Sequence, residues 1–174
     1  GATYTAVIGT GFVDNEGTAS AGYSWTFSVA SAVNPKVSTV FPLDESDGVS
    51  RSATIRATFS KSIDPDTIKG DLVTPSTTFL VYVDANRNGV YDAAIDTQQV
   101  PGVVEYVDST LTATFTPDPQ LTYAAYVVVL KGGAADPTIR DLNGTEMAAD
   151  YPWNFSTVPD VGPAKRYYQH VVRF

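Results

Sequence analysis

The chain has 174 residues, with 11 basic and 19 acidic side chains and a formal net charge of −8. An acidic surface repels a phosphate backbone, so the charge balance argues against nucleic-acid binding. The absence of cysteine excludes disulfides, thiolate metal sites and cysteine nucleophiles. No apolar run approaches the roughly 18 residues of a transmembrane helix, so we expect no membrane span.

Strand-forming residues dominate the periodic stretches of the chain. It contains 10 Tyr and 8 Phe, and Val, Thr and Ile fill most of the alternating segments, which favours β-structure. Turns are supplied by 13 Gly and 11 Pro, and no window shows apolar residues at helical spacing. Composition and periodicity together predict an all-β chain.

The first two predicted strands span residues 3–8 and 23–28. In the second, Tyr23, Trp25 and Phe27 alternate with small polar residues, which is the pattern of a strand with one buried face. A stretch rich in Gly and Asp joins the two strands, and residues 29–35 form a short linker.

After the linker, strands are predicted at residues 35–42, 53–59, 77–83, 103–107, 110–115, 123–131 and 151–157. Residues 43–48 are expected to form a turn and residues 64–68 a single helical turn. Short strands with turns at roughly 8–12-residue spacing are typical of a two-sheet sandwich. Tyr123 follows a Pro-rich turn, as the tyrosine-corner residue of such sandwiches does.

Alternation also predicts which side chains of these strands point inward. On two of the strands the inner residues are Ile55, Ala57 and Phe59, and Leu111, Ala113 and Phe115. On the last strand we expect Trp153 and Phe155 to belong to the core.

Part of the sequence occurs twice. Tyr23–Ser28 (YSWTFS) returns 128 positions later as Tyr151–Ser156 (YPWNFS), and each copy follows a D-x-x-G-T loop, at 14–18 and 141–145. A Tyr-led strand precedes each loop. A repeat with a whole-domain period indicates tandem domains. The resulting interpretation is a partial repeat at 1–28, a complete domain at 29–158, and a linker with a spare strand at 159–174.

Short motifs in a fixed order run through the complete domain: Pro35-x-Val37, Phe41-Pro-Leu-Asp-Glu45, Ile55-x-Ala-x-Phe59-Ser60, Leu111-x-Ala-x-Phe115-x-Pro117, Leu121-x-x-x-x-Tyr126, Asp141-x-x-Gly144 and Trp153-x-Phe155. With them the domain resembles the bacterial Ig-like domain of S-layer proteins and large surface adhesins. The resemblance implies an extracellular or cell-surface, repeated and non-catalytic immunoglobulin-like sandwich. An insertion at 84–96 departs from the family's pattern, so a site there would not be inherited from the family.

The insertion reads Asp84-Ala-Asn-Arg-Asn-Gly-Val-Tyr-Asp92 and ends at Asp96. Its D-x-N-x-N-G spacing resembles an EF-hand calcium loop without the flanking helices, in which oxygen ligands at alternate positions face one centre. The predicted calcium ligands are Asp84, Asn86, Asn88, the Val90 carbonyl, Asp92 and Asp96. Ile95 stands where such loops carry a bidentate Glu. The alternative is a turn rich in Asn and Asp that holds no metal.

Enzyme motifs are missing from the sequence. His170 is the single histidine, and there is no G-x-S-x-G, P-loop or G-x-G-x-x-G pattern. We therefore expect a protein that is not an enzyme.

Three minor features complete the inventory. The four tyrosines Tyr82, Tyr91, Tyr106 and Tyr126 either stack on sugars or pack within the sandwich. The D-x-x-G-T loops are expected to be turns held by their Asp side chains, not cation sites. Asn143 stands in an N-x-[ST] sequon and is a weak candidate for glycosylation.

Neither end of the chain belongs to a complete domain. Two strands alone are marginally stable in water, and residues 1–28 carry core-type side chains that something must cover. Residues 165–174 are rich in strand formers. Either the chain is cut from a larger multidomain protein, or the tail of one copy adds a strand to the hairpin of the next.

The assembly residues predicted on the second reading are Tyr4, Ile8, Trp25 and Phe27 in the hairpin, and Tyr167, Tyr168, Val171, Val172 and Phe174 in the tail. Two tail registers remain open, because a slip of one residue exchanges the faces. In one register Tyr168, His170, Val172 and Phe174 point inward, and in the other Tyr167 and Val171 do.

The sequence thus predicts an all-β immunoglobulin-like two-sheet sandwich, preceded by the C-terminal hairpin of a second Ig-like repeat. Its expected role is a structural segment of an extracellular fibre, S-layer or adhesin, with other copies of itself or neighbouring Ig-like repeats as partners. The alternative role is a calcium-stiffened spacer or glycan-binding module of a larger secreted or surface protein. Because the chain opens with Gly1 and not with Met, we expect a processed product or a fragment.

Overall fold

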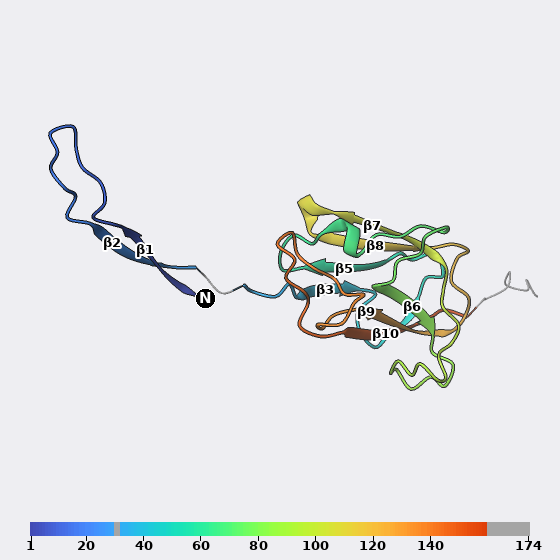
Figure 1. Ribbon diagram of the computed structural model, residues 1–174. Coiled ribbons are helices and arrows are strands. Elements are labelled where there is room, and N and C mark those ends of the chain that lie inside the picture. The colour runs from blue at the N-terminus through green and yellow to red at the C-terminus, as the bar shows by residue number, and fades with distance from the viewer. Residues whose placement is uncertain (30–31, 160–174) are drawn as a thin grey trace, which may run out of the picture. The chain divides into compact units, whose positions relative to one another are not determined.

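In the computed structural model the chain forms two units, divided between Val33 and Asn34. The structure describes residues 1–29 and 32–159. The first unit is a two-stranded hairpin, and the second contains two four-stranded sheets. These sheets lie in two layers, which confirms the predicted two-sheet sandwich (Figure 1). Among the described residues, no helix is long and apolar enough to cross a membrane.

Within residues 32–159, eight strands build the sandwich. One sheet has the order β4-β10-β9-β6, formed by β4 (Ser46–Val49), β6 (Phe79–Val83), β9 (Ala125–Leu130) and β10 (Tyr151–Thr157). The other has the order β3-β5-β8-β7, formed by β3 (Val37–Phe41), β5 (Ile55–Phe59), β7 (Gly102–Val107) and β8 (Thr112–Pro117). Two short 3-10 turns, η1 (Pro65–Thr67) and η2 (Asp108–Thr110), connect strands.

The core lies between the two sheets and is formed by the alternating apolar residues. Ile55, Ala57 and Phe59 are buried on β5 as predicted, and so are Trp153 and Phe155 on β10. Phe79 of β6 links the two layers, because its ring lies 5.8 Å from that of Phe115 and 6.1 Å from that of Trp153. Aromatic pairs at such distances add to the stabilisation from burial alone.

Four local predictions are wrong. Strand β4 occupies part of the predicted turn at 43–48 and pairs with β10 in parallel; its sequence, Ser-Asp-Gly-Val, has no alternating apolar residues to reveal it. Residues 108–110 form η2, so β8 begins at Thr112 and not at residue 110 as predicted. Consequently Leu111 adopts a left-handed conformation with φ 53° and precedes β8 instead of lining its inner face.

The fourth correction concerns the tyrosine corner. Tyr123 is exposed, whereas Tyr126 is buried and its hydroxyl donates to the Thr122 carbonyl at 3.1 Å. The same hydroxyl accepts from the Thr122 amide at 2.9 Å. A tyrosine corner is defined by this bond from a hydroxyl back to the backbone a few residues upstream, so Tyr126 is the corner residue. The motif Leu121-x-x-x-x-Tyr126 carries it.

The first unit contains β1 (Thr3–Ile8) and β2 (Tyr23–Ser28), antiparallel and with the predicted bounds. The expected buried face of β2 is not covered in this structure, because all six of its residues are exposed. Its core-type side chains therefore face solvent within the described part of the chain.

Candidate functional site

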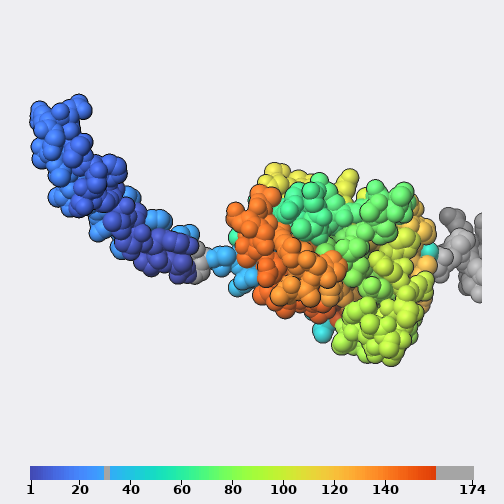
Figure 2. Space-filling view, viewed as in Figure 1, coloured from blue at the N-terminus to red at the C-terminus, as the bar shows by residue number. Residues whose placement is uncertain are grey.

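The predicted calcium loop begins where β6 ends and projects from the body of the sandwich (Figures 1 and 2). Asp84, its first residue, is anchored at the end of the sheet because its amide donates to the Ala125 carbonyl at 3.0 Å. Its side chain is buried, and the carboxylate accepts from the amides of Asn88 at 3.3 Å and Gly89 at 2.8 Å. Asp84 thus organises the first half of the loop around its own charge.

Asp96 organises the second half of the loop in the same way. It is buried, its Oδ1 accepts from the Ala85 amide at 3.0 Å, and its Oδ2 accepts from the Asp92 amide at 2.8 Å. The two buried carboxylates therefore belong to the first and last residues of one loop. None of the ion pairs found among the described residues involves either of them.

The other predicted ligands take part in successive turns. The Asn86 side-chain oxygen accepts from the Asn88 amide at 3.2 Å, and the Asn88 oxygen accepts from the Val90 amide at 2.8 Å. The Asp92 carboxylate accepts from the Ala94 amide at 2.9 Å. Within residues 1–29 and 32–159, no group of three or more His, Cys, Asp or Glu side chains is arranged to hold a metal ion. Calcium binding stays a prediction, and both sequence interpretations of the loop remain open.

The loop is attached to its surroundings by aromatic and amide contacts. The rings of Tyr82 and Tyr91 stack with their centroids 4.8 Å apart. Burial, together with the hydrogen bond to Tyr91, raises the pKa of Tyr82 to about 12. The Asn154 side-chain amide of β10 donates to the Gly89 carbonyl at 3.3 Å. These contacts fix the outer part of the loop against the sheet.

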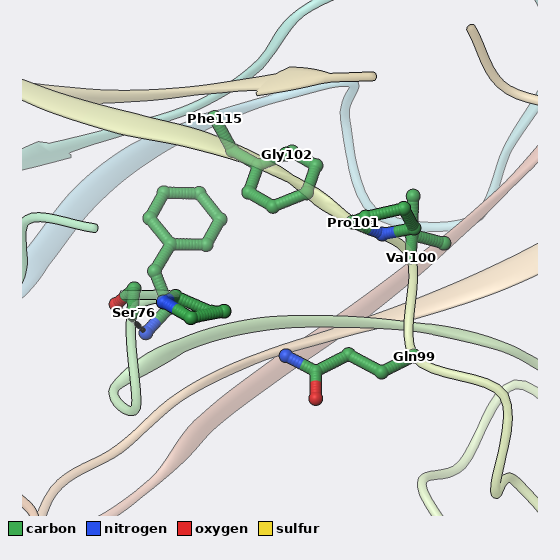
Figure 3. Close-up of a pocket in the computed structure, with 8 residues that line it drawn as sticks. Ser76, Gln99, Val100, Pro101, Gly102 and Phe115 are labelled. Atoms are coloured by element: carbon green, nitrogen blue, oxygen red, sulfur yellow. Dashed lines mark hydrogen bonds between the residues drawn. The ribbon is translucent and has the colours of Figure 1, made fainter. Parts of the chain in front are cut away.

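Two of the hollows on the sandwich surface differ in their lining residues. One lies beside Gly102 and is lined by Ser76, Gln99 and Phe115 among others (Figure 3). The Ser76 hydroxyl donates to the Ile68 carbonyl at 2.8 Å and accepts from the Phe79 amide at 3.0 Å. These hydrogen bonds give Ser76 a structural role. The other hollow adjoins the calcium loop and is lined by Asp44, Glu45, Val90, Tyr91 and Asp150, among others.

The hairpin β1–β2 has the same strand register as β9–β10. Trp25 pairs with Ala6 and Phe27 with Tyr4, as Trp153 pairs with Val128 and Phe155 with Tyr126. The Tyr4 and Phe27 rings stack with centroids 5.6 Å apart and planes at 22°. The Tyr126 and Phe155 rings do so at 5.4 Å and 23°. The repeat seen in the sequence is therefore also a repeat of strand register.

The two D-x-x-G-T loops are alike bond for bond. The Asp14 carboxylate accepts from the amides two and four residues on, at 2.9 and 2.8 Å. The Asp141 carboxylate accepts from the corresponding amides at the same two distances. Gly17 and Gly144 both have a positive φ, of 84° and 79°, which suits glycine. Both loops are therefore turns held by an Asp side chain, as the sequence predicts.

Asp141 has one partner more than these backbone amides. Lys61 follows β5, and its Nζ lies 2.6 Å from Oδ2 of the buried Asp141. The hydrogen bond from Lys61 is the main reason that the pKa of Asp141 falls to about 2. For the exposed Asp14 the backbone bond from Thr18 lowers the pKa.

Exposure separates the two hairpins. Trp25 and Phe27 are 44% and 50% exposed, whereas Trp153 and Phe155 are 2% exposed each. Tyr4 and Ile8 are exposed as well, while their counterparts Tyr126 and Leu130 are buried. The hairpin half of the predicted assembly set is therefore an accessible apolar face. The tail half, Tyr167 to Phe174, lies outside the described residues, as does His170.

The remaining predicted residues are placed as follows. Asn143 is exposed in its loop, so its side chain is accessible. Tyr106 and Tyr126 are buried within the sandwich, and Tyr82 and Tyr91 stack on each other. Tyr106 and Tyr126 therefore pack within the sandwich, as one of the two alternatives predicts, whereas the stacking covers one ring face each of Tyr82 and Tyr91.

The sandwich is similar to known proteins. Residues 31–157 match the family described as Bacterial Ig-like domain. The solved S-layer protein rSbsC(31-844) is similar over 76% of this chain, with 23% identity and a TM-score of 0.46; the chain spans only 14% of that protein's length. PcoC, a methionine-rich copper resistance protein from Escherichia coli, is similar over 72% of this chain and 100% of its own, with 12% identity and a TM-score of 0.49.

No curated protein sequence matches the chain, and identities this low concern the fold alone. The family match, in contrast, covers well over half of the chain and includes both sheets of the sandwich. It confirms the resemblance that the sequence motifs indicate. The chain belongs to the bacterial Ig-like domain family.

Proposed function

We propose that the chain is a non-catalytic structural segment of an extracellular surface assembly, such as a fibre, S-layer or adhesin, in which Ig-like units follow one another. The observation that carries the proposal is the identical register of β1–β2 and β9–β10. A chain that contains one whole Ig-like unit and the matching hairpin of another is organised as consecutive units, which build an extended structure. Family membership supports the same role.

The polar groups of the sandwich support a structural role as well. Buried polar side chains such as Asp141, Ser76 and Thr157 bond to neighbouring backbone or to Lys61. Such bonds stabilise a fold.

Units of the assembly are proposed to join head to tail by strand addition. In the complete unit β6 pairs with β9 in antiparallel orientation, so the equivalent edge of β1 has room for one more strand. Backbone pairing at such an edge supplies affinity, and alternate side chains supply specificity. Residues 165–174 of another copy are the donor that the sequence predicts.

Removing residues 165–174 tests this mode of joining. The full chain should form concentration-dependent oligomers in light scattering, and the shortened chain should be monomeric. The variant Phe27→Asp, which alters the acceptor hairpin, should have the same effect, whereas Ser24→Asp on the opposite face of β2 should not. Oligomers that persist without the tail would exclude it as the donor.

A calcium-stiffened spacer is the second candidate function. It is favoured by Asp84 and Asp96, two buried carboxylates of one loop whose neutralising partner is not among the described side chains. Burying unpaired charge is costly, and calcium prefers carboxylate, amide and carbonyl oxygens of the kind this loop carries. The binding of calcium would stiffen the loop by joining its two ends.

A further inference from the structure

We propose that the exposed face of β1–β2 is the docking surface for the first strands of an Ig-like unit, equivalent to residues 34–122 of this chain. The hairpin would then be the closing hairpin of a second sandwich. This inference rests on the proposed structural role and names the partner that the hairpin takes: a set of strands from both sheets.

The face is preformed for such a partner. Its aromatic pair, Tyr4 and Phe27, is already stacked as Tyr126 and Phe155 are in the finished core. Trp25 stands in the strand position of Trp153, beside a tyrosine whose ring centroid is 5.9 Å away. A partner that fits the β9–β10 face would meet the same side chains in the same register here.

The contacts of the buried hairpin β9–β10 show which segments a partner of β1–β2 has to supply. Trp153 packs against Phe79 of β6, and Phe79 in turn stacks on Phe115 of β8 in the opposite sheet. Asp141 forms an ion pair with Lys61, which follows β5. Three segments in two sheets are needed to reproduce these contacts. A single added strand covers one edge of the hairpin and leaves its ring face open, so these ring-face contacts need the further strands of an Ig-like unit.

The tyrosine corner fixes how the two parts connect. Tyr126 bonds to the backbone of Thr122, four positions earlier. Because Tyr4 takes the place of Tyr126 in the register, the equivalent of Thr122 falls immediately ahead of Gly1. A copy of residues 34–122 joined directly to Gly1 therefore restores the corner with no added linker.

The first experiment adds a second copy of residues 34–122 in front of the full chain, with Trp153→Phe throughout. The two tryptophans of the chain are Trp25 and Trp153, and the added segment contains none, so fluorescence then reports Trp25 alone. We expect the emission of Trp25 to shift to shorter wavelength, its quenching by acrylamide to fall several-fold, and a second cooperative unfolding transition to appear.

Two substitutions in the extended chain are the matched controls. Phe27→Asp lies on the docking face and should abolish the protection of Trp25. Ser24→Asp lies on the opposite face, where the counterpart Pro152 is exposed, and should leave the protection unchanged. Equal effects of the two variants would overturn the proposal.

A second variant keeps the test decisive if the added segment fails to fold. In the full chain, residues 123–157 are replaced by a second copy of residues 1–29, so that the hairpin closes a sandwich already known. Cooperative unfolding of this chain supports the proposal, and loss of the folded sandwich contradicts it.

One further result would overturn the proposal: Trp25 is protected in the unextended chain, and this protection is lost when residues 165–174 are removed. That result would assign the face to the tail. These readouts do not require self-association. A chain that never oligomerises would therefore count against the proposed head-to-tail assembly while leaving this inference standing.

Discussion

Tyr4 stacks on Phe27 at the surface in the arrangement that Tyr126 and Phe155 adopt inside the sandwich. The stacking comes with the register, because Tyr4 is the cross-strand partner of Phe27 and Tyr126 that of Phe155. Neighbouring rings on a pleated face meet whether or not a second sheet covers them. The same local geometry therefore occurs with and without a core, and exposure is what differs.

Trp153→Ala should destabilise the sandwich by about 3–5 kcal/mol, the usual cost of deleting a large buried aromatic side chain. Trp25→Ala is the matched control, because the same substitution in the exposed hairpin should leave the main unfolding transition unchanged. Chemical denaturation monitored by circular dichroism measures both. A cost near zero for Trp153→Ala would show that its side chain does not fill the core.

The Lys61–Asp141 pair should make stability depend on acid pH. The pKa of Asp141 is lowered from 3.8 to about 2, mainly by the hydrogen bond from Lys61, so this carboxylate stabilises the folded state above its unfolded pKa. That contribution should be lost as the pH falls from about 4 to about 2. Melting temperatures across this range should show a shallower decline in Lys61→Met, which lacks the ammonium group. An unchanged slope would mean that the pair has no such role.

Calcium at millimolar concentration should raise the melting temperature of the full chain if the 84–96 loop binds it. Ligand that binds only the folded state stabilises it by about 2.7 kcal/mol at one hundred times the dissociation constant. Asp84→Asn and Asp96→Asn should each remove the rise, whereas Asp66→Asn in η1 should retain it. If the parent chain melts at one temperature with calcium and with chelator, the loop is a plain turn.

Tyr82 should titrate late in alkali. Burial and the hydrogen bond to Tyr91 raise its pKa from 10.0 to about 12, so the folded state holds this proton more tightly than the unfolded state does. The corresponding stability is present below pH 10 and should be lost as the pH rises through about 12. Ultraviolet titration should show the same change near pH 10 in the parent and in Tyr82→Phe, and a later change near pH 12 that Tyr82→Phe lacks. Tyr91→Ala, which uncovers the ring, should bring the transition of Tyr82 toward the ordinary value.

Much of the fold is readable from the sequence because its strands alternate cleanly. β1, β2 and β10 have the predicted bounds, and Ile55, Ala57 and Phe59 point inward on β5. β4 escapes prediction because its residues are polar and it owes its existence to pairing with β10. Such pairing is a tertiary effect that local pattern does not encode.

The candidate sites divide in the same way. The D-x-N-x-N-G spacing identifies the loop, but it does not reveal that Asp84 and Asp96 are the two buried carboxylates while Asn86 and Asn88 are exposed. That difference depends on where β6 ends and how the loop returns to the sheet. The tyrosine corner is misplaced by three positions for a related reason, since only packing selects Tyr126 over Tyr123.

Oxidative footprinting of the two tryptophans, in the isolated chain and in the native surface assembly, tests the central claim most directly. In the isolated chain Trp25 should be modified much faster than Trp153, because it is 44% exposed against 2%. In the assembly both should be protected to a similar extent, since the hairpin face is then covered. Continued rapid oxidation of Trp25 in the assembly would contradict the account.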